Sequence, residues 1–333
     1  MHHGGDIGPA KSAYGEPAEG WLDLSTGINP LAYPFQMPDP ACWRRLPQVE
    51  AERRVLQAAR SAYGLADRAD ICAAPGTQSL IQILPRLRPG ASVSVVGPTY
   101  TEHAATWRAE GATVMPVPAL AEASGDVVVV VNPNNPDGRI VAPTEIAGLV
   151  RGLQARNGLL VVDEAFADVD PGVSVAAMAG EPGLVVLRSF GKFYGLGGVR
   201  LGFAVGHGAD IDRLRRWLGP WATSGPALEI GAVALSDQAW AQTARAELRR
   251  QSAALAGLLV AQGFSVLGNA GLFVLSGHKR AGDLHAALAR RGIWVRLFER
   301  HPTWLRFGLP GPAFARFAGG LAAAVHELGG GSS

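Results

Sequence analysis

The sequence has few cysteines, almost no net charge and no long hydrophobic run. Its two cysteines, Cys42 and Cys72, are too few for a disulfide framework and lack the spacing of metal ligands, so no metal site is expected. Because 30 basic and 28 acidic residues leave a formal net charge of +2, no nucleic-acid or membrane-surface partner is indicated. No segment approaches the roughly 18 consecutive apolar residues of a membrane span. The N-terminus also lacks the basic and apolar regions of a secretory signal, so a cytoplasmic location is expected.

The composition is that of a globular protein with a large core. Hydrophobic residues make up 48% of the 333 residues and charged residues 17%. This length suffices for two packed domains. Residues 1–42 are rich in glycine and proline with little periodicity, which predicts an N-terminal arm. Residues 43–225 are predicted as a large domain and residues 226–333 as a small C-terminal domain.

Short apolar runs alternate with helical patterns through the predicted large domain. Runs without polar alternation are typical of strands that are buried on both faces of a sheet. The predicted strands are 92–96, 126–131, 159–162, 184–187 and 201–205, and the predicted helices are 78–87, 102–110, 143–156 and 210–217. After residue 226 a long, broken helical stretch precedes short strands and a further helix. The pattern predicts an α/β fold with a mostly parallel central sheet wrapped by helices, and a smaller α+β domain at the C-terminus.

The segment 189–202 carries the strongest chemical signal. Lys192 follows an apolar run, with Ser189 three residues before it and Arg200 eight residues after it. A lysine can form a Schiff base, and a serine and an arginine can hold a phosphate group beside it. Glycines around the lysine let a flat cofactor approach the backbone. The combination predicts pyridoxal 5′-phosphate, whereas the lysine by itself is more typical of a solvated glycine-rich loop.

Two further polar motifs follow predicted strands and support the same site. Asn135 and Asp163 are 28 residues apart, and Asp163 and Lys192 are 29 apart, each about one βα unit. Because ligands bind beyond the carboxyl ends of parallel strands, the three side chains are expected at one rim of the sheet. Asp163 would keep the pyridine nitrogen of the cofactor protonated, and Asn135 would donate a hydrogen bond to its phenolic oxygen. Taken alone, these residues are also compatible with a loop cap and a turn.

Upstream, two weaker signals fit the same cofactor. Gly76, Thr77 and Gln78 lie where a predicted helix starts, and the free amides at such a start can bind phosphate. Tyr100 follows the next predicted strand, where its ring could stack on the cofactor. A helix cap and a core tyrosine are the alternative interpretations of these two motifs.

In this order and spacing, the motifs resemble those of the fold-type I pyridoxal-phosphate enzymes of the class I and II aminotransferase superfamily. The resemblance extends from about residue 43 to residue 307. It implies that Lys192 binds the cofactor covalently and that Arg306 binds a substrate carboxylate. It assigns the cofactor phosphate to Ser189, Arg200, Thr77 and Gln78. It also implies a homodimer, although Leu46 stands where many relatives have a tyrosine that reaches the partner subunit's cofactor.

Within this superfamily, the N-terminal motifs resemble those of the L-threonine-O-3-phosphate decarboxylases of cobalamin biosynthesis. The motifs are His2-His-Gly-Gly-Asp6 and Trp21-Leu-Asp-Leu-Ser-Thr-Gly-Ile-Asn-Pro30, together with Asp163-Glu-Ala-Phe166. The resemblance implies decarboxylation of L-threonine O-3-phosphate to (R)-1-amino-2-propanol O-2-phosphate and CO2. It places substrate contacts at His3, Gly27, Asn29, Arg296 and Arg306.

Two other functions stay open at this point. A histidinol-phosphate-type aminotransferase would use the same residues but break the Cα–H bond. Such an enzyme normally has a tyrosine at the position of Phe166, which is a predicted cofactor-binding residue. A non-catalytic regulator domain that senses pyridoxal phosphate would need a DNA-binding module, and the first 45 or so residues show no helix-turn-helix pattern.

Overall fold

The computed structural model describes residues 4–329, which fall into two compact units. The larger unit consists of Ala32–Asn135 and Arg139–Arg245, and the smaller unit combines the N-terminal residues to Leu31 with Pro136–Gly138 and the chain from Ala246 onward. The first 31 residues therefore belong with the C-terminal residues. The predicted boundaries at residues 42 and 225 stay predictions.

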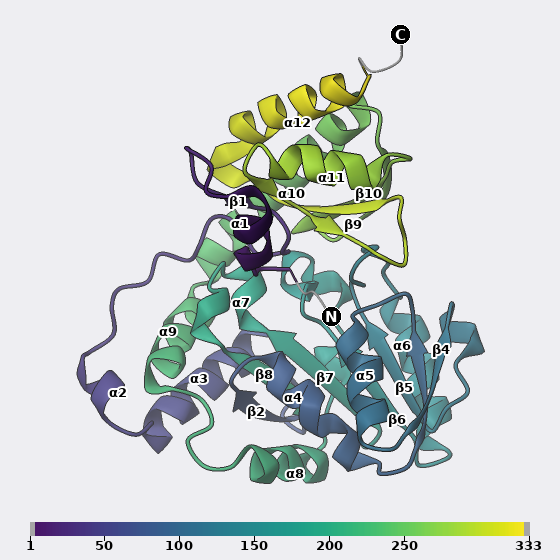
Figure 1. Ribbon diagram of the computed structural model, residues 1–333. Helices are drawn as coiled ribbons and strands as arrows, with labels where there is room; N and C mark the ends of the chain where they lie inside the picture. The colour runs from purple at the N-terminus through teal and green to yellow at the C-terminus, as the bar shows by residue number, and fades with distance from the viewer. Residues whose placement is uncertain (1–3, 330–333) are drawn as a thin grey trace. The chain divides into compact units, whose positions relative to one another are not determined.

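A seven-stranded sheet forms the centre of the larger unit within the described residues (Figure 1). Its order is β2 (Asp70–Ala74), β8 (Gly202–Gly206), β7 (Leu184–Ser189), β6 (Leu159–Asp163), β5 (Val127–Val131), β3 (Ser92–Val96) and β4 (Thr113–Val117). β8 pairs antiparallel with both β2 and β7, and the other pairings are parallel. β5 consists of five buried valines, which suits a central strand covered on both faces.

Helices surround this sheet. They are α2 (Ala41–Arg44), α3 (Val49–Ala62), α4 (Thr77–Ile83), α5 (Thr101–Ala109), α6 (Pro143–Gln154), α7 (Phe190–Phe193), α8 (Gly208–Leu218) and α9 (Gly225–Ser236). The short 3-10 helices are η1 (Leu84–Leu87), η2 (Leu120–Glu122), η3 (Ala167–Val169), η4 (Pro171–Val173), η5 (Ala176–Met178) and η6 (Gly197–Val199). Side chains of α4, α5 and α8, such as Leu80, Trp107 and Ile211, share one core with alternate residues of the strands. These three helices thus cover one face of the sheet.

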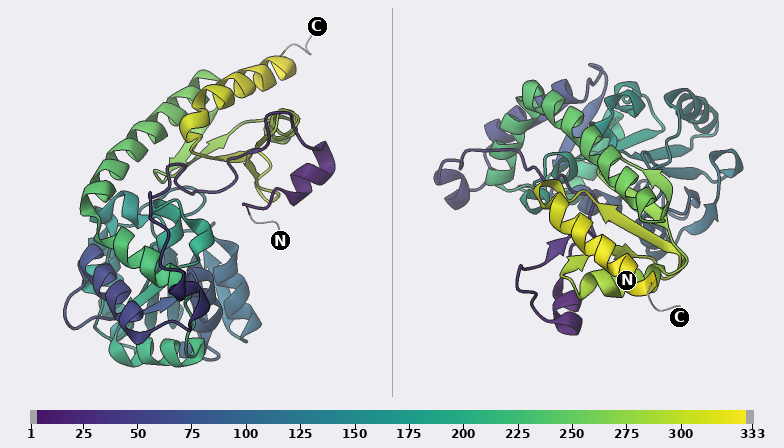
Figure 2. Two further views of the ribbon diagram at one scale, coloured as in Figure 1. Left: turned by 90° about the vertical axis from the view of Figure 1, so that its left-hand side faces the viewer. Right: turned by 90° about the horizontal axis from the view of Figure 1, so that it is seen from above.

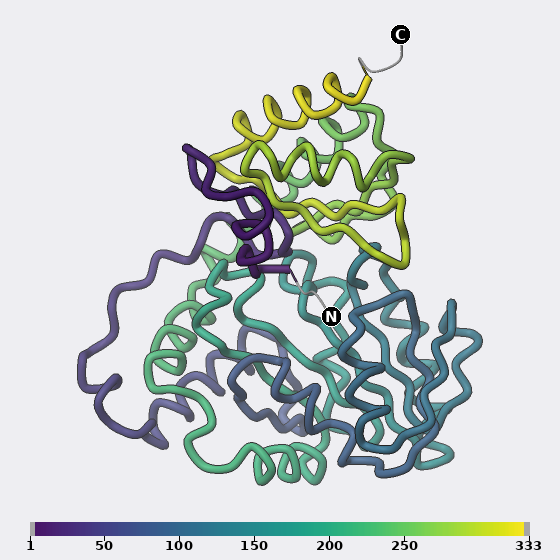
Figure 3. The backbone as a smooth tube through the Cα atoms, in the orientation of Figure 1, coloured from purple at the N-terminus to yellow at the C-terminus, as the bar shows by residue number. Residues whose placement is uncertain are grey.

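The smaller unit is α+β. Its four-stranded antiparallel sheet has the order β12 (Arg296–Leu297), β13 (Trp304–Gly308), β10 (Phe273–Gly277) and β9 (Ser265–Asn269). The N-terminal β1 (Leu22–Asp23) pairs with β11 (Ile293–Trp294), so the purple chain start runs beside yellow-green strands in Figure 3. The remaining elements are α1 (Gly8–Tyr14), α10 (Gln238–Ala261, which begins in the larger unit), α11 (Ala281–Ala289), η7 (Gly311–Ala313) and α12 (Phe314–Gly329). α12, yellow in Figure 2, packs on α11.

The predicted α/β fold class is confirmed, and so is the break in the helical stretch after residue 226, which falls at Asp237 between α9 and α10. β2, β4 and the arm helix α1 were not predicted from the sequence. β4 is an exposed edge strand that contains Pro116, so it lacks the apolar run by which its neighbours were found. Among residues 4–329, no helix has the length and apolar character needed to cross a membrane.

Candidate active site

Three parallel strands bring the predicted cofactor residues to one edge of the larger unit's sheet. Val131 of β5, Asp163 of β6 and Leu187 of β7 are register partners across the sheet. Asp163 is the last residue of its strand, and Lys192 lies in α7, which starts directly after β7. The backbone thus aligns the segments that carry these residues, as the spacing predicted.

Asp163 is held by two hydrogen bonds in a buried setting. The Nε2 atom of His103 lies 2.9 Å from Oδ2 of Asp163, and the backbone N–H of Ala165 donates to Oδ1 at 3.0 Å. Asp163 is 3% exposed and His103 1%. Because a carboxylate accepts hydrogen bonds, His103 donates from Nε2 and fixes the orientation of Asp163.

His103 was not found from the sequence. It lies on α5, three residues after Tyr100, so the two side chains share one side of the helix start. Their rings make an edge contact with centroids 6.1 Å apart. The spacing of Tyr100 and His103 indicates that these two side chains lie together, but it does not reveal the contact of His103 with Asp163.

Two buried asparagines fix the loop that contains Asn135. Asn132 and Asn134 are buried, and their side chains bond to the backbone of Val141 and Pro98 and to the hydroxyl of Thr99. They hold the loop. Asn135 is half-buried, and its role at the cofactor stays a prediction.

Small residues form a tight cradle where three motifs meet. Gly76 has φ +81°, and a Cβ there would lie 3.0 Å from Cζ of Arg200. A Cβ at Gly202 would lie 2.6 Å from the backbone nitrogen of Thr77. Arg200 itself adopts a left-handed conformation with φ +57° and donates from Nη1 to the carbonyl of Gly197 at 2.9 Å. The exposed Arg200 is thereby fixed beside the amides that precede α4, an arrangement suited to a phosphate group.

Tyr100 and Gln78 are joined in the same region. The Tyr100 hydroxyl donates to Oε1 of Gln78 at 3.0 Å, and Nε2 of Gln78 lies 3.2 Å from Glu102. Burial raises the pKa of Tyr100 to about 12, with Glu102 and Asp163 adding to the shift and Arg200 opposing it. Tyr100 therefore stays protonated and neutral at physiological pH.

Lys192 lies near the ring of Phe166. Its Nζ atom is 5.9 Å from the ring centroid, and the lysine is half-buried. Phe166 is 5% exposed, and Ser189, the last residue of β7, is 8% exposed. The amine thus lies near an apolar ring, and Ser189 precedes Lys192 by three residues at the end of β7.

A buried ionic cluster lies on the opposite face of the same strands. Arg188 precedes Ser189 and Glu164 follows Asp163, and side chains alternate between the faces of a sheet. Arg188, 2% exposed, donates to Glu164 at 2.6 Å and also bonds to Asp168 and, at 3.0 Å, to Ser174. Burial by itself lowers the pKa of Arg188, but Asp168 and Glu164 outweigh it and raise the pKa above its usual value. The cluster links Arg188 and Glu164, which are adjacent in the chain to Ser189 and Asp163, two residues predicted to bind the cofactor.

The smaller unit contains the predicted anion-binding arginines. Arg296 of β12 and Arg306 of β13 are register partners. Arg306 is 7% exposed, and burial together with the charge of Arg296 lowers its pKa to about 10, so it stays charged at neutral pH. Burial also lowers the pKa of Arg296. Two guanidinium groups side by side favour an anionic ligand.

Of the other predicted substrate contacts, Asn29 is buried at 3% exposure, and its Oδ1 accepts a hydrogen bond from the backbone N–H of Leu31 at 2.9 Å. Gly27 lies in the same segment and is also buried. His3 lies outside the described residues. These assignments stay predictions.

The residues of the larger unit fit pyridoxal phosphate. They supply a half-buried amine, a fixed carboxylate, a glycine cradle beside an arginine, and a neutral phenol, which are the groups that this cofactor requires. A histidinol-phosphate aminotransferase from Sinorhizobium meliloti, solved in complex with pyridoxal-5′-phosphate, has the same fold, with a TM-score of 0.80 at 18% identity over 96% of this chain and 94% of that one. This likeness shows that the chain shares the fold of that enzyme.

The chain belongs to the class I and II aminotransferase family, because the sequence model of that family matches residues 47–313. It is 44% identical to a threonine-phosphate decarboxylase from Sinorhizobium sp over 92% of each chain, and 43% identical to one from Pseudomonas aeruginosa over 93% of each. A histidinol-phosphate aminotransferase from Ruegeria sp. is more distant, at 30% identity over 93% of this chain and 91% of its own. The resemblance drawn from the motifs is confirmed.

Proposed function

We propose that this protein is a pyridoxal-phosphate-dependent decarboxylase that converts L-threonine O-3-phosphate to (R)-1-amino-2-propanol O-2-phosphate and CO2. The main structural support is Asp163, whose carboxylate is fixed by His103 at the end of β6, next to the strand that leads to Lys192. The higher identity to decarboxylases than to aminotransferases favours this reaction over transamination.

In this reaction the Cα–carboxylate bond breaks, CO2 leaves, and a proton takes its place at Cα. Bound pyridoxal phosphate supplies the electron sink for the pair of electrons left at Cα. Asp163 would accept a hydrogen bond from the pyridine nitrogen and so keep a proton there. Ser189, Arg200 and the amides after Gly76 would bind the cofactor phosphate. Lys192 would hold the cofactor, and its Nζ atom would return the proton to Cα.

Arg296 and Arg306 of the smaller unit are the proposed binding residues for the phosphate and the carboxylate of the substrate. Decarboxylation and transamination differ in which bond at Cα breaks.

The direct test supplies L-threonine O-3-phosphate without any 2-oxo acid and measures CO2 and the phosphorylated amino alcohol. The decarboxylase releases both in equal amounts. Histidinol phosphate with 2-oxoglutarate serves as the comparison, and glutamate production there without CO2 from threonine phosphate would favour the aminotransferase.

We also propose that the enzyme works in cobalamin biosynthesis, in the cytoplasm. The product is the aminopropanol phosphate that the resemblance implies for this pathway. Cells that lack the protein should regain cobalamin synthesis when supplied with that product, and cell fractionation would locate the protein.

Loss of the His103 hydrogen bond should weaken cofactor binding. A hydrogen bond to a charged group is worth about 1.5–3 kcal/mol, which corresponds to roughly a 10- to 150-fold rise in the cofactor's dissociation constant in His103→Phe. Titration of the apoenzyme followed by fluorescence measures this without any turnover. His103→Asn, which retains an N–H donor, should recover part of the affinity, and equal affinities in all three proteins would exclude the role.

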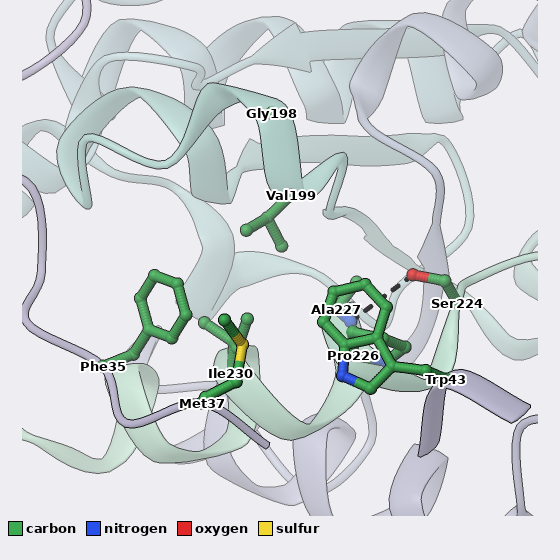
Figure 4. Close-up of a pocket in the computed structure, with 9 residues that line it drawn as sticks. All are labelled: Phe35, Met37, Trp43, Gly198, Val199, Ser224, Pro226, Ala227 and Ile230. Carbon is green, nitrogen blue, oxygen red and sulfur yellow. Dashed lines mark hydrogen bonds between the residues drawn. The ribbon is translucent and has the colours of Figure 1, made fainter. Parts of the chain in front are cut away.

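An apolar hollow on the larger unit supports the predicted homodimer. Phe35, Met37 and Trp43 face Val199 and Ile230 across it, and a hydrogen bond from the backbone of Ala227 to Ser224 fixes the start of α9 (Figure 4). Met37 is 75% exposed and Trp43 59%. A second hollow adjoins it, lined among others by Leu46 and by Trp221, which is 59% exposed. Exposed apolar surface of this kind is typical of an interface.

Charges placed in these hollows should prevent dimer formation. Trp43→Asp and Trp221→Asp are expected to shift the protein from dimer to monomer in light scattering after size-exclusion chromatography, because each would bury an unpaired carboxylate. Met115→Asp, on the exposed edge strand β4, is the matched control and should stay dimeric. A monomeric wild type, or a dimeric Trp43→Asp variant, would contradict the proposal.

A further inference from the structure

Gly4 and Gly5, the two glycines of the N-terminal motif, pack against the backbone close to Arg306. A Cβ at Gly4 would overlap the carbonyl oxygen of Ser25, so only glycine permits this approach. Gly5 has φ +92°, a conformation that also favours glycine, and its N–H donates to Oγ of Ser25 at 2.8 Å. The arm therefore contacts Ser25 through its backbone.

Ser25 uses each of its polar atoms. Its N–H and its hydroxyl both donate to Oδ1 of Asp23, at 2.8 and 2.6 Å, while the hydroxyl oxygen accepts from Gly5. Its carbonyl oxygen accepts from Nη2 of Arg306 at 2.7 Å. Ser25 is 1% exposed, so water does not compete for these bonds.

The strand that carries Arg306 is fixed to the same segment. The N–H of Gly308 donates to the carbonyl of Leu24 at 2.7 Å, and a Cβ at Gly308 would overlap the carbonyl oxygen of Thr26. Residues 24–26 thus lie between the arm on one side and β13 on the other. A displacement of the arm would be transmitted to the carbonyl that orients the Arg306 guanidinium.

We propose that Ser25 is a positioning residue that couples the arm at Gly4 and Gly5 to the anion-binding guanidinium of Arg306. An anion on Arg306 favours the guanidinium orientation that bonds to Ser25, and this orders the arm. In turn, the seated arm preorganises Arg306 for the anion. The inference depends on the proposed function only in taking Arg306 as an anion-binding residue.

Hydrogen exchange tests the coupling without catalysis. In the wild type, inorganic phosphate and L-threonine O-3-phosphate should each slow exchange in the peptide that contains Gly5. Ser25→Ala removes the hydroxyl but keeps the carbonyl, and should abolish this protection. Ser265→Ala, on the exposed strand β9 of the same unit, is the control and should retain it. Unchanged protection in Ser25→Ala overturns the proposal.

Kinetics provide the second readout. Ser25→Ala should raise KM for threonine phosphate by about 3- to 10-fold, the effect of one lost hydrogen bond, with kcat nearly unchanged. Gly4→Ala should also raise KM, since it displaces the arm without altering Ser25. This variant provides the test if Ser25→Ala fails to fold. An unchanged KM in Gly4→Ala contradicts the coupling. If the wild type did not decarboxylate threonine phosphate, the proposed function would be refuted but the coupling would not. The hydrogen-exchange experiment with inorganic phosphate tests the coupling independently of the reaction.

Discussion

Lys192→Ala should lower the rate of decarboxylation by about 10⁴-fold or more while leaving the fold intact. In the proposed mechanism, the variant loses both the covalent attachment of the cofactor and the proton donor to Cα. No other lysine can replace it within the larger unit, because the chain's other two lysines, Lys11 and Lys279, belong to the smaller unit. The half-buried position of Lys192 makes the fold tolerant of alanine.

The measurement is CO2 release together with mass spectrometry after borohydride reduction. The wild type should carry the reduced cofactor on Lys192, and Lys192→Ala should carry none. Lys279→Ala, in an exposed turn, should match the wild type in both respects. A reduced cofactor still attached to the Lys192→Ala protein would show that the assignment is wrong.

Arg188→Met should destabilise the larger unit by about 3–5 kcal/mol. The substitution leaves the carboxylates of Glu164 and Asp168 buried without their cation, and removing one partner of a buried ion pair typically costs this much. The guanidinium also lies 4.3 Å from the centroid of the Tyr63 ring, a contact that methionine replaces only in part.

Urea unfolding of the apoenzyme measures the change in the free energy of unfolding. Arg53→Met is the matched control, since Arg53 pairs with Glu50 at the surface, where a pair is worth about 0–1 kcal/mol. If Arg188→Met were no more destabilised than Arg53→Met, the cluster would not contribute to stability as described.

The parts of the site that the sequence predicts are those that depend on local order. Asp163 and Lys192 could be found because each follows a recognisable strand, and parallel strands one βα unit apart end at the same edge. His103 could not be assigned from its neighbours alone, because its partner Asp163 is 60 residues away and only the packing of α5 on the sheet joins them.

Other features have no sequence signal at all. Ser25 acts on Arg306 through its carbonyl oxygen, which every residue possesses, across 281 residues of sequence. Arg188 lies at the end of an apolar run, and nothing in its sequence context predicts that it pairs with Glu164 and Asp168. The α/β fold class was accessible from the sequence because buried apolar strands are visible in it, whereas these pairings arise only from tertiary structure.

Side chains at the ends of β6 and β7 alternate between the two faces of the sheet. The register of these strands therefore determines which side chains face the candidate active site. Asp163 and Ser189 face the side of the sheet that α4 and α5 cover, and Glu164 and Arg188 face the other side. Deleting one residue within β7 would turn a guanidinium toward the cofactor and bury a serine among carboxylates. Length variation in homologous enzymes should therefore be confined to the loops outside Leu184–Ser189, and an alignment gap within that strand would mark a chain that has lost this chemistry.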